Sequence, residues 1–218
     1  MSTLASFYHS SVGKKFIVGC TGLFLCTFLI VHLYINLFLF KQDGGETFNV
    51  YAEFMATNPV VRTLEIVLFA GFFGHILTSS ILWYKSKLAR PEKYLVTHPL
   101  ESSTFSSRIT FLTGSIIFIF LVIHMRTFWV ASRFYAAENP SMYALVSSAF
   151  KSPIYDAFYF IALFLLGFHL RHGFQSAFQT FGLRGKRYEG LIELIGVIFW
   201  LVVPVAFAAM PLFFLLRA

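Results

Sequence analysis

The sequence predicts an all-α integral membrane protein with five transmembrane helices, and three observations lead to this fold class. Hydrophobic residues make up 57% of the 218 positions, and charged residues make up only 12%, about half of the roughly 25% that soluble domains average. Five apolar runs are each long enough to cross a hydrocarbon core about 30 Å thick, which takes roughly 20 helical residues. The turn-forming and charged residues are concentrated between these runs.

We expect one transmembrane domain over residues 1–218. Its five spans are expected at about 15–40, 62–84, 108–130, 154–180 and 190–216. The loop after the first span contains Gly44-Gly45, a turn signal. The loop after the third span has a weakly apolar middle, Tyr143–Phe150, which is expected to form a short surface helix. In the last span, Pro204 and Pro211 are expected to kink the helix.

The 17 Lys and Arg residues give the orientation, because basic residues accumulate in cytoplasmic loops. Eleven fall on the side of the N-terminus, namely Lys14, Lys15, Lys85, Lys87, Arg90, Lys93, Arg108, Arg171, Arg184, Lys186 and Arg187. Six fall on the other side, namely Lys41, Arg62, Arg126, Arg133, Lys151 and Arg217. We therefore expect the inner (cytoplasmic) membrane of a cell, with the N-terminus cytoplasmic and the C-terminus outside. The net charge of +7 is explained by this topology, so nucleic acid is not an expected partner.

The first three spans carry one histidine each, the fourth carries His169 and His172, and the depths of His32, His75, His124 and His169 match in pairs. At a rise of 1.5 Å per residue, His32 and His124 lie about 24–26 Å from the cytoplasmic starts of two helices that run outward. His75 and His169 lie about 20–24 Å from the outer starts of two helices that run inward. The pattern therefore predicts an outer pair and an inner pair at two levels of a four-helix bundle.

Two imidazoles that face each other across a bundle can bind the iron of one b-type haem from both sides. The sequence therefore predicts two haems b, the outer one on His32 and His124 and the inner one on His75 and His169. No Cys-x-x-Cys-His motif occurs, which excludes covalent attachment of a c-type haem. Zinc is a weaker alternative, since no carboxylate or thiolate is placed to complete a tetrahedral site. A bundle without haem, in which the histidines only bridge helices, is a further alternative.

Small and polar residues near each pair are candidate haem contacts. Gly71 lies one turn before His75, and Gly173 lies one turn after His169, so a porphyrin can approach both backbones. His172 can replace His169 as a ligand or donate a hydrogen bond to a haem propionate. Propionate or neighbouring contacts are expected, with ordinary helix-end solvation as the alternative, at Thr78, Ser79, His172 and Ser176 for the inner haem and at Asn36 and Arg126 for the outer one.

Short motifs around these histidines point to one known family. They are Ser10-Ser11-Val12-Gly13-Lys14-Lys15, Thr21-Gly22-Leu23-Phe24, Val31-His32-Leu33, Glu65-Ile66-Val67-Leu68-Phe69-Ala70-Gly71 with His75, Leu121-Val122-Ile123-His124, and Gly167 to Phe178. Over nearly its whole length the chain resembles the membrane cytochrome b subunit of succinate dehydrogenase and fumarate reductase, in the single-chain, five-helix, two-haem form. The resemblance implies the same two ligand pairs. It also implies a fourth-span ligand followed four residues later by glycine, which fits His169 and not His172.

The resemblance further implies an electron-carrying membrane anchor. Its partners would be flavoprotein and iron–sulfur subunits on the cytoplasmic face, which we expect to dock on the basic loops 85–107 and 182–189, together with membrane lipid and quinone. Menaquinone is the expected quinone, reacting near the outer haem with the help of a carboxylate. Glu65 is the first candidate for this proton-exchanging group, followed by Glu53 and Asp156. A carboxylate in a first helical turn is also favourable without any such role.

Two other functions fit parts of the same pattern. One is a di-haem ferric or ascorbate reductase that works without soluble partners. The other is a polytopic transporter or scaffold without haem. The direction of the reaction, succinate oxidation or fumarate reduction, depends on quinone potential and metabolite levels and not on this chain.

Overall fold

The computed structural model describes residues 6, 7, 9–89, 105–135 and 141–217. Within these ranges every regular element is a helix and no strand occurs. Five helical segments are long and apolar enough to cross a membrane: Ser11–Phe40, Pro59–Leu88, Phe105–Phe134, Pro153–Thr180 and Glu189–Leu215. The predicted fold class, an all-α integral membrane protein with five transmembrane helices, is thereby confirmed.

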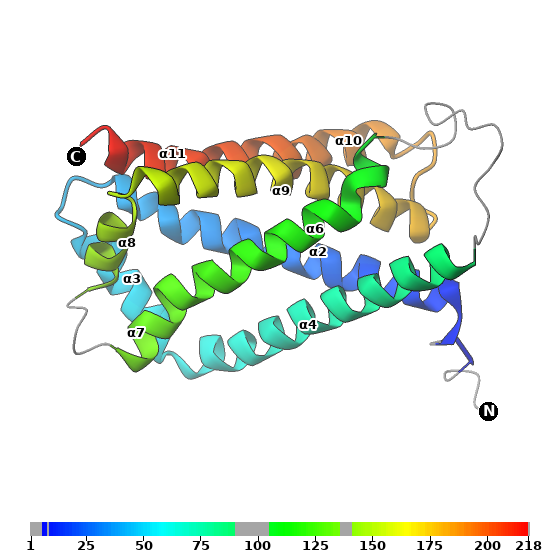
Figure 1. Ribbon diagram of the computed structural model, residues 1–218, viewed down its shortest axis with the longest axis horizontal. Helices are drawn as coiled ribbons and strands as arrows, with labels where there is room; N and C mark the ends of the chain where they lie inside the picture. The colour runs from blue at the N-terminus through cyan, green and yellow to red at the C-terminus, as the bar shows by residue number, and fades with distance from the viewer. Residues whose placement is uncertain (1–5, 8, 90–104, 136–140, 218) are drawn as a thin grey trace.

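The five spans are built from the helices labelled in Figure 1. They consist of α2 (Ser11–Asn36) with the 3-10 turn η1 (Leu37–Phe40), α4 (Pro59–Leu88), α6 (Phe105–His124) with the π-helical turn η2 (Met125–Val130) and α7 (Ala131–Phe134), α9 (Pro153–Thr180), and α10 (Glu189–Val197) with the π-helical turn η3 (Ile198–Val202) and α11 (Val203–Leu215). Two short helices, α3 (Glu46–Thr57) and α8 (Met142–Ala149), lie at the end where the chain finishes. The second of them is the surface helix predicted at Tyr143–Phe150.

The spans begin one to four residues earlier than expected, and for three of them capping residues account for this. The side chains of Ser10, Asn58 and Ser152 accept hydrogen bonds from backbone N–H groups in the first turns of α2, α4 and α9. These bonds satisfy donors that have no partner inside a helix. Pro59 and Pro153 follow two of the caps, at a position where the missing N–H of proline does no harm.

Glycines form the turns in two of the four connections between the spans. Gly182 has a positive φ of 71° and ends α9 with two reverse hydrogen bonds, from Gly182 N to Gln179 O and from Leu183 N to Phe178 O. The short loop after η1 turns at Gly44 and Gly45, whose φ values are also positive. In that loop the hydrogen bond from the Thr47 hydroxyl lowers the pKa of the half-buried Asp43 carboxyl.

One of the two predicted docking loops is only partly visible. Of loop 85–107, residues 90–104 lie outside the described ranges, and these include Arg90, Lys93 and His98. The other basic loop, 182–189, is described and forms the turn between α9 and α10.

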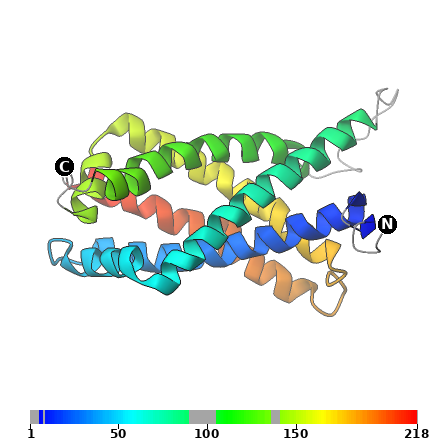
Figure 2. The ribbon, with the colours of Figure 1, turned by 90° about the horizontal axis from the view of Figure 1, so that it is seen from below.

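The spans pack as an elongated bundle (Figures 1 and 2). α2 packs against α4 and α9, and α6 packs against α9. The last span packs against α9 and, through α11, against α2. Aromatic rings join α4 to the third span at two places, where Trp83 stacks on Phe111 with ring centroids 3.8 Å apart and Trp129 meets Phe69 at 5.4 Å.

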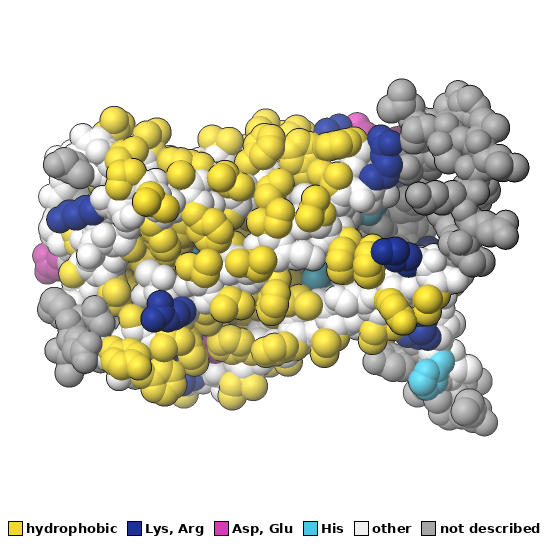
Figure 3. Space-filling view, in the orientation of Figure 1, with side chains coloured by type: hydrophobic (Ala, Val, Ile, Leu, Met, Phe, Trp, Pro, Cys, Tyr) yellow, Lys and Arg dark blue, Asp and Glu magenta, His cyan; other side chains and the backbone are white. Residues whose placement is uncertain are grey.

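Most large apolar side chains of the spans face outward. Figure 3 shows hydrophobic side chains over the middle of the visible face, with Lys and Arg gathered toward both ends. Ile66 and Phe164, for example, are 71% and 67% exposed. A surface of this kind is stable only in an apolar solvent such as lipid, which agrees with the fold class.

Candidate functional site

The first pair of membrane histidines lies toward the end of the bundle that holds the C-terminus, and we call it the C-end pair. His32 on α2 and His124, the last residue of α6, have ring centroids 5.9 Å apart and planes at 81°. Phe28 stacks on His32, and Phe207 from α11 lies 5.5 Å from the same ring. The sequence predicted these two side chains at one level, and the fold brings them together.

Hydrogen bonds orient the rings of the C-end pair. The Tyr159 hydroxyl, on α9, lies 2.6 Å from His124 Nδ1. Asn36, a predicted propionate contact, donates instead to the His32 carbonyl oxygen at 2.8 Å, and its Nδ2 lies 3.4 Å from His32 Nδ1. Arg126, the other such candidate, lies in the π-helical turn that directly follows His124.

The second pair lies toward the end that holds the N-terminus, and we call it the N-end pair. His75 on α4 and His169 on α9 have ring centroids 6.4 Å apart and planes at 75°. The Thr21 hydroxyl lies 3.1 Å from His75 Nδ1, and it donates its hydrogen to the Ile17 carbonyl at 2.8 Å. A hydroxyl has one hydrogen to give, so while it donates to Ile17 it can only accept at His75, which corresponds to the tautomer with the proton on Nδ1. The Nε2 lone pair of His75 is then available to a metal.

Two glycines that the sequence analysis did not single out face the N-end pair. A Cβ atom added to Gly22 on α2 would lie 3.2 Å from His75 Cε1, and one added to Gly114 on α6 would lie 3.2 Å from His169 Cε1. The Nδ1 atom of His169 is buried and has no hydrogen-bond partner among the described residues. Space beside both imidazoles therefore depends on glycine in the facing helix.

The glycines proposed from sequence have different surroundings. A Cβ on Gly71 would lie 2.9 Å from the Phe24 ring, so this position serves the packing of α2 on α4. Gly173 has open space around it. A sequence signal for the facing glycines did exist: Gly22 and Gly114 each lie ten residues before the histidine of their own helix, His32 and His124.

Comparison with known proteins finds a relative that is similar to this chain over most of its length. The succinate dehydrogenase cytochrome b558 subunit of Bacillus subtilis (strain 168) is 28% identical over 173 residues, which cover 77% of this chain and 80% of that protein. The chain is similar to a succinate dehydrogenase cytochrome b subunit. The resemblance predicted from the motifs is thus confirmed. No family model matches the chain, and no solved structure matches it at a significant level.

Glu65, the predicted proton group, is held by three donors near the C-terminal end. Its carboxylate accepts hydrogen bonds from Arg62 at 2.6 Å, from Trp129 Nε1 at 2.7 Å and from Arg133 at 3.1 Å. The last two residues belong to η2 and α7, so Glu65 ties α4 to the end of the third span. Its role toward a quinone stays a prediction.

Asp156, unlike Glu65, is buried without hydrogen-bond donors around its carboxylate in the described part of the chain. It lies in the first turn of α9 and is 1% exposed, yet neither carboxylate oxygen has a hydrogen-bond partner within the described ranges. The buried hydroxyl of Tyr155 has none there either. Tyr159, which contacts His124, follows Asp156 by one turn of the same helix. A buried carboxyl without a partner is rare in native proteins and requires an explanation, such as an ordered water, an ion or a proton-exchanging role.

The remaining residues predicted to contact the inner haem lie near the N-end pair. Within the described ranges, none of them forms a hydrogen bond with His75 or His169. Thr78 is buried on α4 and His172 is partly buried on α9. Ser79 and Ser176 lie on the same two helices, and the Ser176 carbonyl accepts a hydrogen bond from Thr180. Their contacts with a haem stay predictions.

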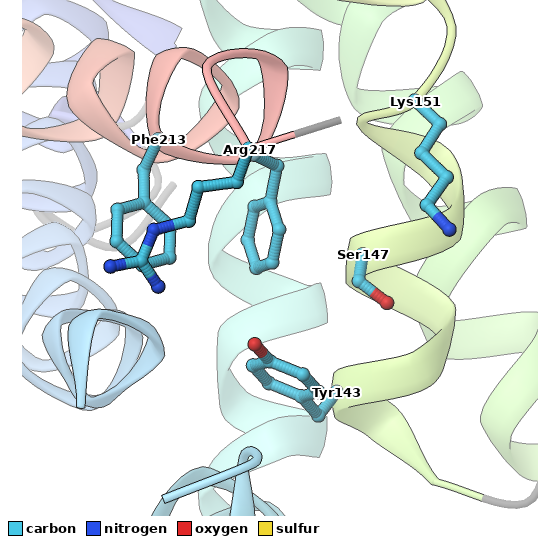
Figure 4. Close-up of a pocket in the computed structure, with 6 residues that line it drawn as sticks. Tyr143, Ser147, Lys151, Phe213 and Arg217 are labelled. Atoms are coloured by element: carbon cyan, nitrogen blue, oxygen red, sulfur yellow. The ribbon is translucent and has the colours of Figure 1, made fainter. Parts of the chain in front are cut away.

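A small pocket at the C-terminal end lies apart from both pairs. It encloses ≈ 200 Å³ between α8 and α11, and Figure 4 shows the residues that line it. They are Tyr143, Ser147, Lys151, Phe213, Phe214 and Arg217. The Arg217 guanidinium lies over the Phe213 ring at 4.1 Å. None of the predicted site residues lines this pocket.

Proposed function

We propose that this chain is the di-haem b membrane anchor of a succinate:quinone oxidoreductase. It carries electrons between an iron–sulfur subunit and membrane quinone, with menaquinone as the expected quinone. The observation that supports this most is the meeting of four histidines, from four successive spans, in two facing pairs. The similarity to a succinate dehydrogenase cytochrome b558 subunit supports the same function. The whole chain, 1–218, acts as one domain.

Each pair fits a haem held by two histidines. An imidazole nitrogen binds a metal ion at about 2 Å, so rings on opposite sides of one ion have centroids about 6 Å apart. The observed distances are 5.9 Å and 6.4 Å. The described residues contain no group of three or more His, Cys, Asp or Glu that could hold a metal ion alone. Two imidazoles alone do not complete a metal site, and a porphyrin would supply the remaining nitrogen ligands.

The residues around the pairs have distinct tasks in this proposal. When bound, each haem supplies a one-electron redox centre. His32 and His124 hold one iron, and His75 and His169 hold the other. Thr21 would keep the proton of His75 on Nδ1 and so leave Nε2 to bind iron, since the hydrogen bond at one ring nitrogen selects the other nitrogen as the ligand. Gly22 and Gly114 leave room beside the N-end imidazoles, Gly173 is a further candidate for clearance, and His172 is a neighbouring group and not a ligand.

The basic N-terminal end is proposed to face the cytoplasm and to receive the flavoprotein and iron–sulfur subunits. Its described turn, 182–189, carries Arg184, Lys186 and Arg187, and only Arg184 approaches an acidic side chain there, Glu189 at 4.0 Å. Affinity purification of the tagged chain from membranes should recover both subunits. Recovery of the haem-containing chain without any flavin or iron–sulfur polypeptide would favour the rival reductase that needs no soluble partner.

A reduced-minus-oxidised absorption spectrum tests the haem directly. Purified chain treated with dithionite should show the α-band of b-type haem. A haem-free transporter or scaffold would show no such band, and that outcome would overturn the proposal.

Two carboxyls are candidates for the proton exchange with quinone at the C-terminal end. Glu65 is the candidate from sequence, but a change in its charge disrupts two ion pairs. Asp156 has no partner to lose within the described chain. We therefore expect Asp156→Asn to lower quinone turnover by about 100-fold at unchanged haem content, because general acid–base groups contribute about that much.

The matched variant Glu65→Gln should act mainly on stability. Partly exposed ion pairs contribute about 1 kcal/mol, which corresponds to about 2–4 °C in Tm for a chain of this length. Thermal unfolding in detergent and quinone turnover are measured for both variants. If Glu65→Gln abolishes turnover while Asp156→Asn retains it, the role belongs to Glu65.

Tyr159 is expected to tune the haem of the C-end pair. Tyr159→Phe removes the neighbour of His124 Nδ1, which weakens the imidazole as a donor to ferric iron. The potential of this haem should rise, by about 60 mV if the hydrogen bond contributes a factor of ten. Redox titration of the α-band measures it, with Tyr143→Phe on α8 as the control. Equal potentials in wild type and Tyr159→Phe would contradict this tuning role.

A further inference from the structure

A groove of ≈ 320 Å³ runs between α9 and the last span, outside the region of the histidine pairs. Its walls are apolar, with Phe160 and Phe164 on α9 and Leu201 and Val205 on the last span. Phe164 is 67% exposed and Val205 is 60% exposed, so the groove opens on the surface that faces lipid. One cationic residue, Arg171, lines it.

Pro204 explains the shape of the last span beside this groove. Proline has no N–H, so the carbonyl of Trp200, four residues earlier, loses its α-helical partner, and the turn Ile198–Val202 is π-helical. The freed Trp200 oxygen lies only 2.8 Å from the place of a Cβ on Gly167. The two helices thus meet backbone to backbone at Gly167, and both residues form part of the wall of the groove. The π-helical turn directly precedes α11, which includes Pro204 in its first turn and continues through Pro211. The predicted kinks at these two prolines stay predictions.

Arg171 lies one turn after Gly167 on the same face of α9. Its guanidinium lies over the Trp200 ring at 5.3 Å from the centroid, and its side chain is exposed. It takes part in none of the ion pairs found between described residues. Arg171 also precedes the end of α9 at Thr180 by nine residues, about 14 Å along the axis. Arg171 is a cation on a span-length apolar helix, where a charged side chain is expected to have a partner, and the described protein provides an aromatic face but no anion.

We propose that this groove binds one phospholipid molecule, with its phosphate on Arg171 and an acyl chain along Phe164 and Val205. A guanidinium binds phosphate oxygens through two parallel hydrogen bonds, which makes arginine well suited to this group. From Arg171 to Phe160 the groove follows α9 for about 16 Å, and its lining over this length is apolar. A neutral quinone headgroup would leave the charge of the guanidinium without a counter-ion. The site is independent of the haem proposal.

The test is lipid retention by the full purified chain. After identical detergent washing, native mass spectrometry should show one bound phospholipid on the wild type and on Lys85→Gln, an exposed cation of the N-terminal end. Arg171→Gln should retain at least tenfold less, and Arg171→Lys should retain an intermediate amount. Equal retention by wild type and Arg171→Gln, or a quinone in place of phospholipid, would overturn the assignment.

A second measurement covers the case in which Arg171→Gln does not fold. Val205→Trp keeps the cation but fills the groove, and it should also lose the lipid. Phosphatidylglycerol titrated into delipidated wild type should raise Tm, whereas inorganic phosphate alone should not, because the acyl chain contributes most of the buried area. A rise with inorganic phosphate that equals the rise with phosphatidylglycerol would contradict a lipid site.

Discussion

Replacing any one of the four paired histidines with alanine should lower the haem content from two per chain to one. The reason is that one proposed haem would lose one of its two histidine ligands, whereas the other histidine pair, which lies at the other level of the bundle, would stay intact. His75→Ala and His169→Ala should lose the same spectral component, and His32→Ala and His124→Ala should lose the other. Pyridine haemochrome quantitation and redox titration of each purified variant measure this.

His172→Ala is the sharpest control for this series. His172 lies three residues after His169 on α9, so the two histidines compete for one role. In the fold it is His169 that faces His75, with the two ring centroids 6.4 Å apart. We expect His172→Ala to retain both haems. Full haem in His169→Ala together with a loss in His172→Ala would assign the ligand to His172.

A bulky side chain at either facing glycine should remove the haem of the N-end pair. In Gly22→Leu and Gly114→Leu the new side chain starts 3.2 Å from the Cε1 of His75 or His169 and has to extend into the space beside that ring. The imidazole is then displaced, and a ligand shift of about 1 Å is enough to disrupt a built site. The C-end haem should stay, so haem content should fall from two to one.

The control for the glycine series is Gly190→Leu, at a position on α10 with open space around it. It should keep both haems. Gly173→Leu tests whether the space for the porphyrin lies beside α9, as the sequence indicated, or beside the facing glycines on α2 and α6. If Gly173→Leu loses haem while Gly22→Leu and Gly114→Leu keep it, the space for the macrocycle lies on α9 and not on the facing helices.

The pairing of the histidines could be predicted because it depends on quantities that a sequence contains. Helix rise and direction place His32 level with His124 and His75 level with His169, and the fold brings both pairs within 6.4 Å. The surface helix α8 could be predicted for a similar reason, since a short apolar stretch between prolines is a local signal. Whether these pairs bind haem stays a prediction.

What the sequence did not reveal depends on contacts between distant segments. Gly22 matters because His75 faces it from another helix, and Gly71 packs on Phe24 for an equally non-local reason. The three donors of Glu65 include Trp129 and Arg133, which lie 64 and 68 positions further along the chain. Burial of Asp156 without a partner likewise appears only once the aromatic cluster around Tyr159 has assembled.

The two π-helical turns differ in how far the sequence explains them. Pro204 accounts for the turn Ile198–Val202, because it removes one N–H donor. The turn Met125–Val130 contains no proline and follows His124 directly. Turns of this type often occur at functional sites, but nothing else in the structure explains this one.

The haem-to-protein ratio of the purified wild-type chain tests the central claim most directly. Haem is measured by the pyridine haemochrome method and protein by quantitative amino-acid analysis of the same sample. Two facing histidine pairs predict two haems b per chain, which titrate as two separate components. One haem or none in folded, monodisperse protein would contradict the account.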